Sequence, residues 1–360
     1  MVFFIAVENF VLFSTLLALA SFTSAWALRR AAESGWWQPH SDTRARLYAA
    51  AITAPPVIAA WLVAAALLPE SWLGEAGFEA AHPAPFHPLH LLGNLTSTLE
   101  PVLAYFTLWL AAAAALFAAS QSVRGYLRAG RVIGRLQLSA APAPAAQLAL
   151  VNQVAEGHGL SVGLVMSDYP FSFVWGFGRS KLVLSSGLLH TLTPAELAGL
   201  LEHEAAHHTR RDNLAKLALT FCGHASLAFP LAWRLLRWRA EQVELVCDEV
   251  AAARTSAPLE IAEALVKLRR RALTHGNAPA SVCASGFIPE DSLSFEQRVC
   301  RVLALTDMPP TAARAQALAR SHKVEALILA AAFAVTLIAV SAFAPLAVHR
   351  AAESLIQIIR

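Results

Sequence analysis

The sequence predicts a mainly α-helical membrane protein with four transmembrane helices and a cytoplasmic α+β domain. Apolar residues make up 56% of the chain and charged residues only 15%, and the mean hydropathy is +0.50. Soluble proteins of this length are seldom so apolar. Four long apolar runs can each cross a bilayer. The net charge of +3, with no basic run interleaved with aromatics, argues against direct nucleic-acid binding.

The four apolar runs divide the chain into three parts. They cover residues 9–28, 47–68, 101–120 and 326–348. The expected parts are three spans with short loops (residues 1–121), a cytoplasmic domain (residues 122–322), and a fourth span with a short extracytoplasmic tail (residues 323–360). The first run ends at Arg29 and Arg30 rather than at a small-residue cleavage site, which is typical of a retained anchor.

Basic residues indicate the orientation of these spans. The loop after the first span and the residues after the third span are rich in arginine, whereas residues 69–100 contain no Lys or Arg. Because basic residues concentrate in cytoplasmic loops, we expect the N-terminus outside and residues 122–322 in the cytoplasm. The Ala- and Arg-rich composition fits a bacterium, whose inner membrane is then the expected location.

The cytoplasmic domain is predicted to begin with a helix over residues 146–156 and a small antiparallel sheet. The helix is closed by Gly157 and Gly159. The strands are expected at residues 160–166, 171–175 and 181–185, which are rich in Val, Phe and Leu. The next helix is expected to begin at Thr193-Pro194-Ala195-Glu196, where Thr and Glu form a capping box.

That helix carries the motif His203-Glu204-Ala205-Ala206-His207. Two His four residues apart lie on one helix face, and a Glu beside the first is how HExxH sites hold zinc and a general base. We therefore expect a zinc endopeptidase in which His203 and His207 bind Zn²⁺ and Glu204 accepts a proton from water. Asp212, five residues after His207, can brace the helix or its C-terminal turn.

A catalytic zinc keeps three protein ligands and one open position. Glu244, in a helix predicted over residues 234–254, is the candidate for the third ligand. Asp248 lies four residues on, on the same face, where its carboxylate can hold the far nitrogen of a ligand His. Glu241 and Glu249 compete with Glu244 for this role.

The segment between these two helices, residues 217–233, is apolar except for a few positions. A single complete crossing would put Glu244 and His203 on opposite sides of the bilayer. The segment must therefore lie on the membrane, re-enter it, or pack into the cytoplasmic domain. His208 and His224 are candidates to stabilise a transition-state oxyanion, although a packing or solvated role is commoner for a single His.

These patterns resemble the BlaR/MecR-type membrane zinc metallopeptidases, which are gluzincins. The resemblance rests on residues 197–213, which contain HExxH and an Asp five residues later, on the sequence from Glu244 to Asp248, and on the three-plus-one arrangement of spans. It implies Zn²⁺ bound by His203, His207 and Glu244, with Glu204 as base. It also implies a cytoplasmic protein substrate, commonly a BlaI/MecI-like winged-helix repressor, and a role in signal transduction.

The same resemblance implies self-cleavage between the zinc domain and the last span. The corresponding region is residues 281–295, with Ser294-Phe295 as the candidate cleavage site. The best-known members carry an extracellular penicillin-binding sensor after the fourth span. This chain stops at Arg360, eleven residues past His349, so direct beta-lactam sensing is not expected.

Two other functions remain open at this level. A membrane signal transducer or scaffold with a structural metal site would differ by having a fourth protein ligand. An HtpX-type quality-control or prenyl-protein endopeptidase shares HExxH and a later glutamate, but the Cys247-Asp248 pair and the single span after the site argue against it. The expected partners are the protein substrate and the lipid bilayer, and a homo-oligomer stays an open alternative.

Overall fold

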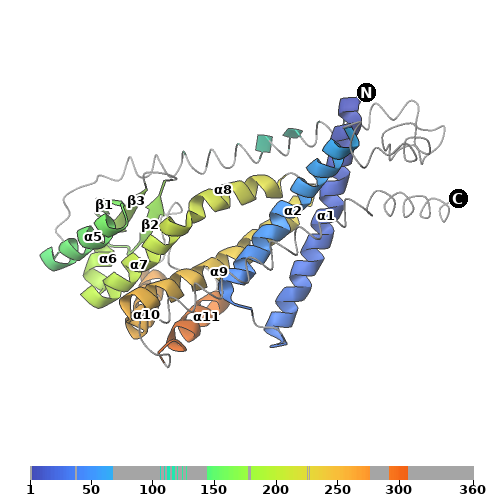
Figure 1. Cartoon of the computed structure of the whole chain (residues 1–360). Coiled ribbons are helices and arrows are strands. Elements are labelled where there is room, and N and C mark those ends of the chain that lie inside the picture. Colours follow the sequence, from blue (N-terminus) through green and yellow to red (C-terminus); the bar gives the residue numbers. More distant parts are fainter. Residues whose placement is uncertain are drawn as a thin grey trace. The chain divides into compact units, whose positions relative to one another are not determined.

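The computed structural model of the chain describes most of two compact units (Figure 1). The described residues are 2–36, 39–67, 144–176, 180–224, 226, 228–275 and 292–306, with isolated helical positions between 106 and 127. The first unit comprises residues 1–120, 219–238 and 324–360, and the second comprises residues 121–218 and 239–323. The predicted fourth span, and all but isolated positions of the third, lie outside the described residues.

In the first unit, helices α1 (Val2–Glu33) and α2 (Ser41–Leu67) lie side by side. They include the first predicted span and all but the last residue of the second. The pair Pro55-Pro56 lies inside α2 without ending it. Within the described part of the chain, one stretch is long and apolar enough to cross a membrane, Ser41–Val63.

The apolar segment at residues 217–233 is not a single helix. Helix α8 (Asp212–Gly223) ends in its middle, and α9 (Phe229–Thr255) begins after a turn. Leu219 of α8 and Leu235 of α9 share a buried core with Tyr48 and Ile52 of α2. The close approach of the two helices requires Gly223, since a Cβ there would lie 2.9 Å from the Cβ of Ala232. The chain therefore leaves the second unit and returns to it through this hairpin.

The second unit contains a three-stranded mixed sheet. Its strands are β1 (Ser161–Val165), β2 (Ser172–Trp175) and β3 (Lys181–Ser185), in the order β1-β3-β2. All three predicted runs are strands, but the expectation of a wholly antiparallel sheet is wrong, because β3 pairs parallel with β1 and antiparallel with β2. The physical reason is that β3 is the central strand. Its residues Leu182, Val183 and Leu184 are all fully buried, as a continuous apolar run on a central strand requires.

The described part of the second unit also contains five further helices. They are α5 (Ala145–Gly157), α6 (Ser186–Thr191), α7 (Pro194–Arg210), α10 (Pro258–His275) and α11 (Ser292–Leu303). The residues of α8 before 219 and those of α9 after 238 belong to the second unit as well. The predicted capping box of α7 is present, since Glu196 N donates to Thr193 Oγ1 and Thr193 N donates to Glu196 Oε2. At Gly199, an added Cβ would lie 2.5 Å from Ile261 Cγ1 of α10. These contacts fix α7 at its start and in its middle.

The pair Ser294-Phe295 does not lie in an exposed loop. It belongs to the first turn of α11, and the side chain of Phe295 packs against the main core of the second unit together with Val299 and Val302. The reason is the helical spacing of these apolar residues, which gives α11 a core-facing side. The rest of the region expected to be cut, residues 281–291, lies outside the described residues.

Candidate metal centre

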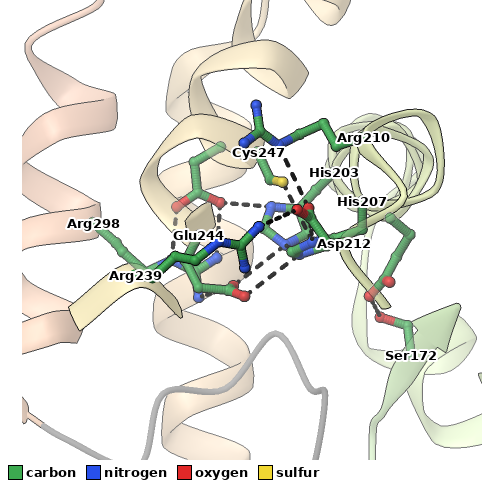
Figure 2. Close-up of polar contacts among 11 residues, drawn as sticks. Ser172, His203, His207, Arg210, Asp212, Arg239, Glu244, Cys247 and Arg298 are labelled. Atoms are coloured by element: carbon green, nitrogen blue, oxygen red, sulfur yellow. Dashed lines mark hydrogen bonds and ion pairs between the residues drawn. The ribbon is translucent and has the colours of Figure 1, made fainter. Parts of the chain in front are cut away.

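Helix α7 brings the two histidines of the motif together. The Nε2 atoms of His203 and His207 lie 3.2 Å apart, and their rings are nearly perpendicular at 76°. His203 is fully buried, whereas the side chain of His207 is 18% exposed. The i,i+4 spacing on a regular helix is sufficient to produce this arrangement. His203 is therefore enclosed by protein and His207 is partly accessible to solvent; Figure 2 shows the two side chains side by side.

Glu244 of α9 completes the group. Its Oε2 lies 3.5 Å from His203 Nε2, and its Oε1 lies 3.4 Å from His207 Nε2. One donor atom from each of the three side chains lies within 4.8 Å of the others. Of the competing acids, Glu249 is paired with Arg301 instead. The structure thus brings together the three residues that the sequence analysis selected as ligands.

Carboxylates fix the orientation of both imidazoles. His203 Nδ1 lies 2.8 Å from Asp248 Oδ1, and His207 Nδ1 donates to Asp212 Oδ2 at 3.0 Å. The Sγ of Cys247 also lies 3.5 Å from His207 Nδ1. With hydrogen on Nδ1, each ring directs the lone pair of Nε2 towards the other ring and towards Glu244.

Three side chains whose donor atoms converge in this way can hold a metal cation between them. Burial alone would lower the pKa of His207, but the charge of Cys247 and hydrogen bonds to Asp212, Cys247 and Glu244 hold it well above its usual value. Burial would raise the pKa of Glu244, but the Arg298 charge and the two histidines hold it well below its usual value. Nitrogen and carboxylate donors in this number suit Zn²⁺, so the residues present fit a zinc ion.

Glu204 lies beside this group and faces the sheet. Its carboxylate is 2% exposed and accepts a hydrogen bond of 2.6 Å from Ser172 Oγ of β2. Burial raises the pKa of Glu204, although the charges of His203 and His207 and the Ser172 hydrogen bond oppose this effect. A buried carboxylate with a raised pKa is suited to accept a proton and return it.

Arginines form an outer layer around the centre. Arg298 of α11 donates through Nε and Nη2 to the two carboxylate oxygens of Asp248, at 2.7 and 2.8 Å. Arg239 and Arg210 lie 3.3 and 3.5 Å from the carboxylate of Asp212. Burial would raise the pKa of Asp212, but His207 and these two arginines hold it below its usual value. Each aspartate thus contacts arginine as well as a histidine of the motif.

Sequence reasoning missed Ser172 and Arg298. Ser172 gave no signal in a strand of mixed composition. Arg298 did give one, because it lies among Phe295, Val299 and Val302 on the apolar side of α11, where an arginine must find a buried partner.

The two remaining histidine candidates have other surroundings. His224 belongs to the first unit, where its ring stacks on Phe229 at 5.8 Å and its Nδ1 donates to the carbonyl of Thr220. His224 therefore has a packing role, which the sequence analysis gave as commoner for a single His than stabilisation of an oxyanion. His208 is partly buried on α7, and burial, with smaller contributions from the charges of His158 and Arg211, lowers its pKa.

Comparison with known proteins supports a metallopeptidase. Residues 142–285 match the model of peptidase family M48, a range that includes β1 to β3, α7 and the three proposed ligands. No solved structure matches the chain. The match covers the centre itself, and it leaves the closer likeness to BlaR/MecR-type enzymes unconfirmed.

Proposed function

We propose that the chain is a membrane-bound zinc endopeptidase that hydrolyses peptide bonds of a cytoplasmic protein. The observation that carries the proposal is the convergence of His203, His207 and Glu244, with the buried carboxylate of Glu204 beside them. Zinc bound there would lower the pKa of a water molecule and polarise the scissile carbonyl.

Glu204 supplies the acid–base chemistry in this proposal. It accepts a proton from the attacking water and passes it to the leaving amine. Ser172 holds one oxygen of the carboxylate, so the other oxygen is left to face the water. With zinc at their Nε2 atoms, His203 and His207 would be neutral ligands whose Nδ1 atoms face Asp248 and Asp212.

The sheet offers a way to align the substrate. Strand β2 is an edge strand of the described sheet and lies next to α7. An extended peptide can add to such an edge by main-chain hydrogen bonds. Asn213 Nδ2 already donates to the carbonyl of Val174 at 2.9 Å, so we expect a peptide to pair nearer to Ser172.

The structural-metal alternative is disfavoured by the ligand count. Among the described residues, no fourth His, Cys, Asp or Glu joins the group of His203, His207 and Glu244. A structural zinc is closed by four protein ligands, whereas a catalytic zinc keeps a position for water.

The membrane assignment is part of the same proposal. It is supported by the apolar stretch Ser41–Val63 and by the shared core of α2 with the hairpin of residues 219–238. In this proposal the four apolar runs are the spans, and the arginine distribution gives an outside N-terminus and a cytoplasmic centre. The composition suggests a bacterial inner membrane. We further propose that the substrate is a winged-helix repressor of the BlaI/MecI kind; the alternative is the broader substrate set of an HtpX-type enzyme.

Metal removal tests the proposed function. The full chain, purified in detergent, is stripped with dipicolinate and incubated with cytosolic proteins, and new N-termini are labelled and sequenced. We expect cleavage to stop on stripping and to return with Zn²⁺. Equal cleavage by the stripped protein would contradict the proposal. Products from a single repressor would favour the regulatory function, and products from many damaged proteins would favour quality control.

A Ser172→Ala variant tests the hydrogen bond to Glu204. A hydrogen bond to a charged group contributes about 1.5–3 kcal/mol, so losing it is expected to lower kcat at least about tenfold. The zinc content should be unchanged, because Ser172 contacts no ligand in the described hydrogen-bond network. Ser161→Ala on β1 is the matched control. Equal kcat for the two variants would show that Ser172 has no part in holding Glu204.

A further inference from the structure

The guanidinium of Arg298 is the most deeply buried cation near the centre. The residue is 1% exposed and comes from α11, beyond the range that matches the peptidase family. Two of its nitrogens bind both oxygens of Asp248, and the third, Nη1, lies 3.1 Å from Glu244 Oε2. Figure 2 shows the Arg298 side chain reaching the carboxylate of Glu244. One side chain therefore contacts both a proposed ligand and the carboxylate that orients another.

The packing of α11 holds this arginine in place. Phe295, Val299 and Val302 on the same side of the helix contact the core of the second unit. One turn after Arg298, Arg301 pairs with Glu249 of α9 at 2.6 Å, but its side chain is 44% exposed. Helix α11 is thus joined to α9 by two ion pairs, Arg298 with Asp248 and Arg301 with Glu249. Only the pair formed by Arg298 reaches the metal centre.

We infer that Arg298 is a positioning residue of the metal centre, an inference that rests on the zinc site of the proposed function. The rigid fork of a guanidinium fixes a carboxylate in two directions, which a lysine cannot do. Bound in this way, Asp248 is held in one orientation, with Oδ1 2.8 Å from His203 Nδ1. The contact from Nη1 restricts rotation of the Glu244 carboxylate, so that its oxygens stay directed at the two Nε2 atoms.

This role makes α11 a necessary part of the site. The family match ends at residue 285, and the motif, both aspartates and Glu244 all lie before that point. A protein that kept every one of those residues but lost the Arg298 contacts would retain the ligands without their fixed geometry. Zinc affinity would fall for that reason, because loss of a group that orients a ligand typically costs about 10–100-fold in metal affinity.

An Arg298→Lys variant tests the inference, with Arg301→Lys as its matched control on the same helix. Both are made in full-length Glu204→Gln protein, so that proteolysis does not alter the sample. Zinc affinity is measured by competition with a chromophoric chelator, and the Co²⁺ absorption spectrum reports the ligand geometry. We expect Arg298→Lys to bind zinc about 10–100-fold more weakly with an altered Co²⁺ spectrum, and Arg301→Lys to match the parent in both.

A second variant separates a loss of zinc affinity from a loss of folding. Arg298→Met leaves the Asp248 charge buried and unpaired, so it is combined with Asp248→Asn, which removes both charges together. We expect this double variant to unfold at a temperature near that of the parent and still to bind zinc weakly. Parent-like affinity in both Arg298→Lys and the double variant would overturn the positioning role. Absence of zinc binding by the parent protein itself, with His203→Ala as reference, would instead overturn the metal centre and the inference with it.

Discussion

Replacing Glu204 with Gln is expected to lower kcat/KM for peptide cleavage by about 10²–10⁴-fold, the usual contribution of a general acid–base group. The amide has the shape of the carboxylate and can still accept the hydrogen bond from Ser172 Oγ, which is 2.6 Å long in the parent. It cannot accept a proton from water. Zinc content, measured by mass spectrometry of the purified protein, is expected to stay unchanged, because Glu204 is not among the three converging ligands.

Glu202→Gln is the matched control for that variant. Glu202 lies two residues earlier on α7, and its carboxylate pairs with Arg254 at 3.0 Å and with His158 at 3.2 Å. Ion pairs this close to the surface contribute about 0–1 kcal/mol, so we expect nearly normal turnover. Unchanged cleavage by Glu204→Gln would rule out the proposed base, and equal losses in the two variants would indicate a general effect of charge on α7.

The start of α7 and the position of its motif could be predicted because the signals are local. Thr193, Pro194 and Glu196 fix the first turn through contacts over three residues, and the capping box is present in the structure. The spacing of His203 and His207 fixes one helix face. Interactions within one turn of a helix depend little on the rest of the chain, so the sequence determined them directly.

The sheet shows what a local pattern leaves undetermined. Composition and turn residues located β1, β2 and β3 within a residue or two. Pairing direction depends instead on where the connections run, and the alternation of side chains is the same in parallel and antiparallel pairs. The position of β3 between β1 and β2 is therefore a property of the packed unit rather than of any one run.

The residues that surround the two histidines make contacts between positions far apart in the sequence. Asp248 was chosen from its spacing to Glu244, and it does bind His203. Arg298, however, is fifty residues beyond Asp248, and Ser172 is thirty-two residues before Glu204. No periodicity links residues so far apart. An arginine on an apolar helix face indicates that a buried acid exists, but only the fold identifies that acid.

Replacing Glu244 with Gln is expected to abolish zinc binding at micromolar metal, with an affinity loss above about 100-fold, since loss of a ligand exceeds the 10–100-fold effect of an outer partner. A neutral amide is a poor ligand for zinc compared with a carboxylate. The amide oxygen can still lie next to Arg298 Nη1, which is 3.1 Å from Oε2 in the parent. The expected loss therefore reflects the missing negative charge rather than a missing contact with α11.

Glu241→Gln on the same helix is the control, because the sequence alone left Glu241 as a competitor for this role. The two variants are matched, since each changes one carboxylate of α9 to an amide. We expect Glu241→Gln to retain zinc in the chelator competition. Loss of zinc from Glu241→Gln with retention in Glu244→Gln would transfer the third ligand to Glu241, despite the contacts of Glu244 with both Nε2 atoms.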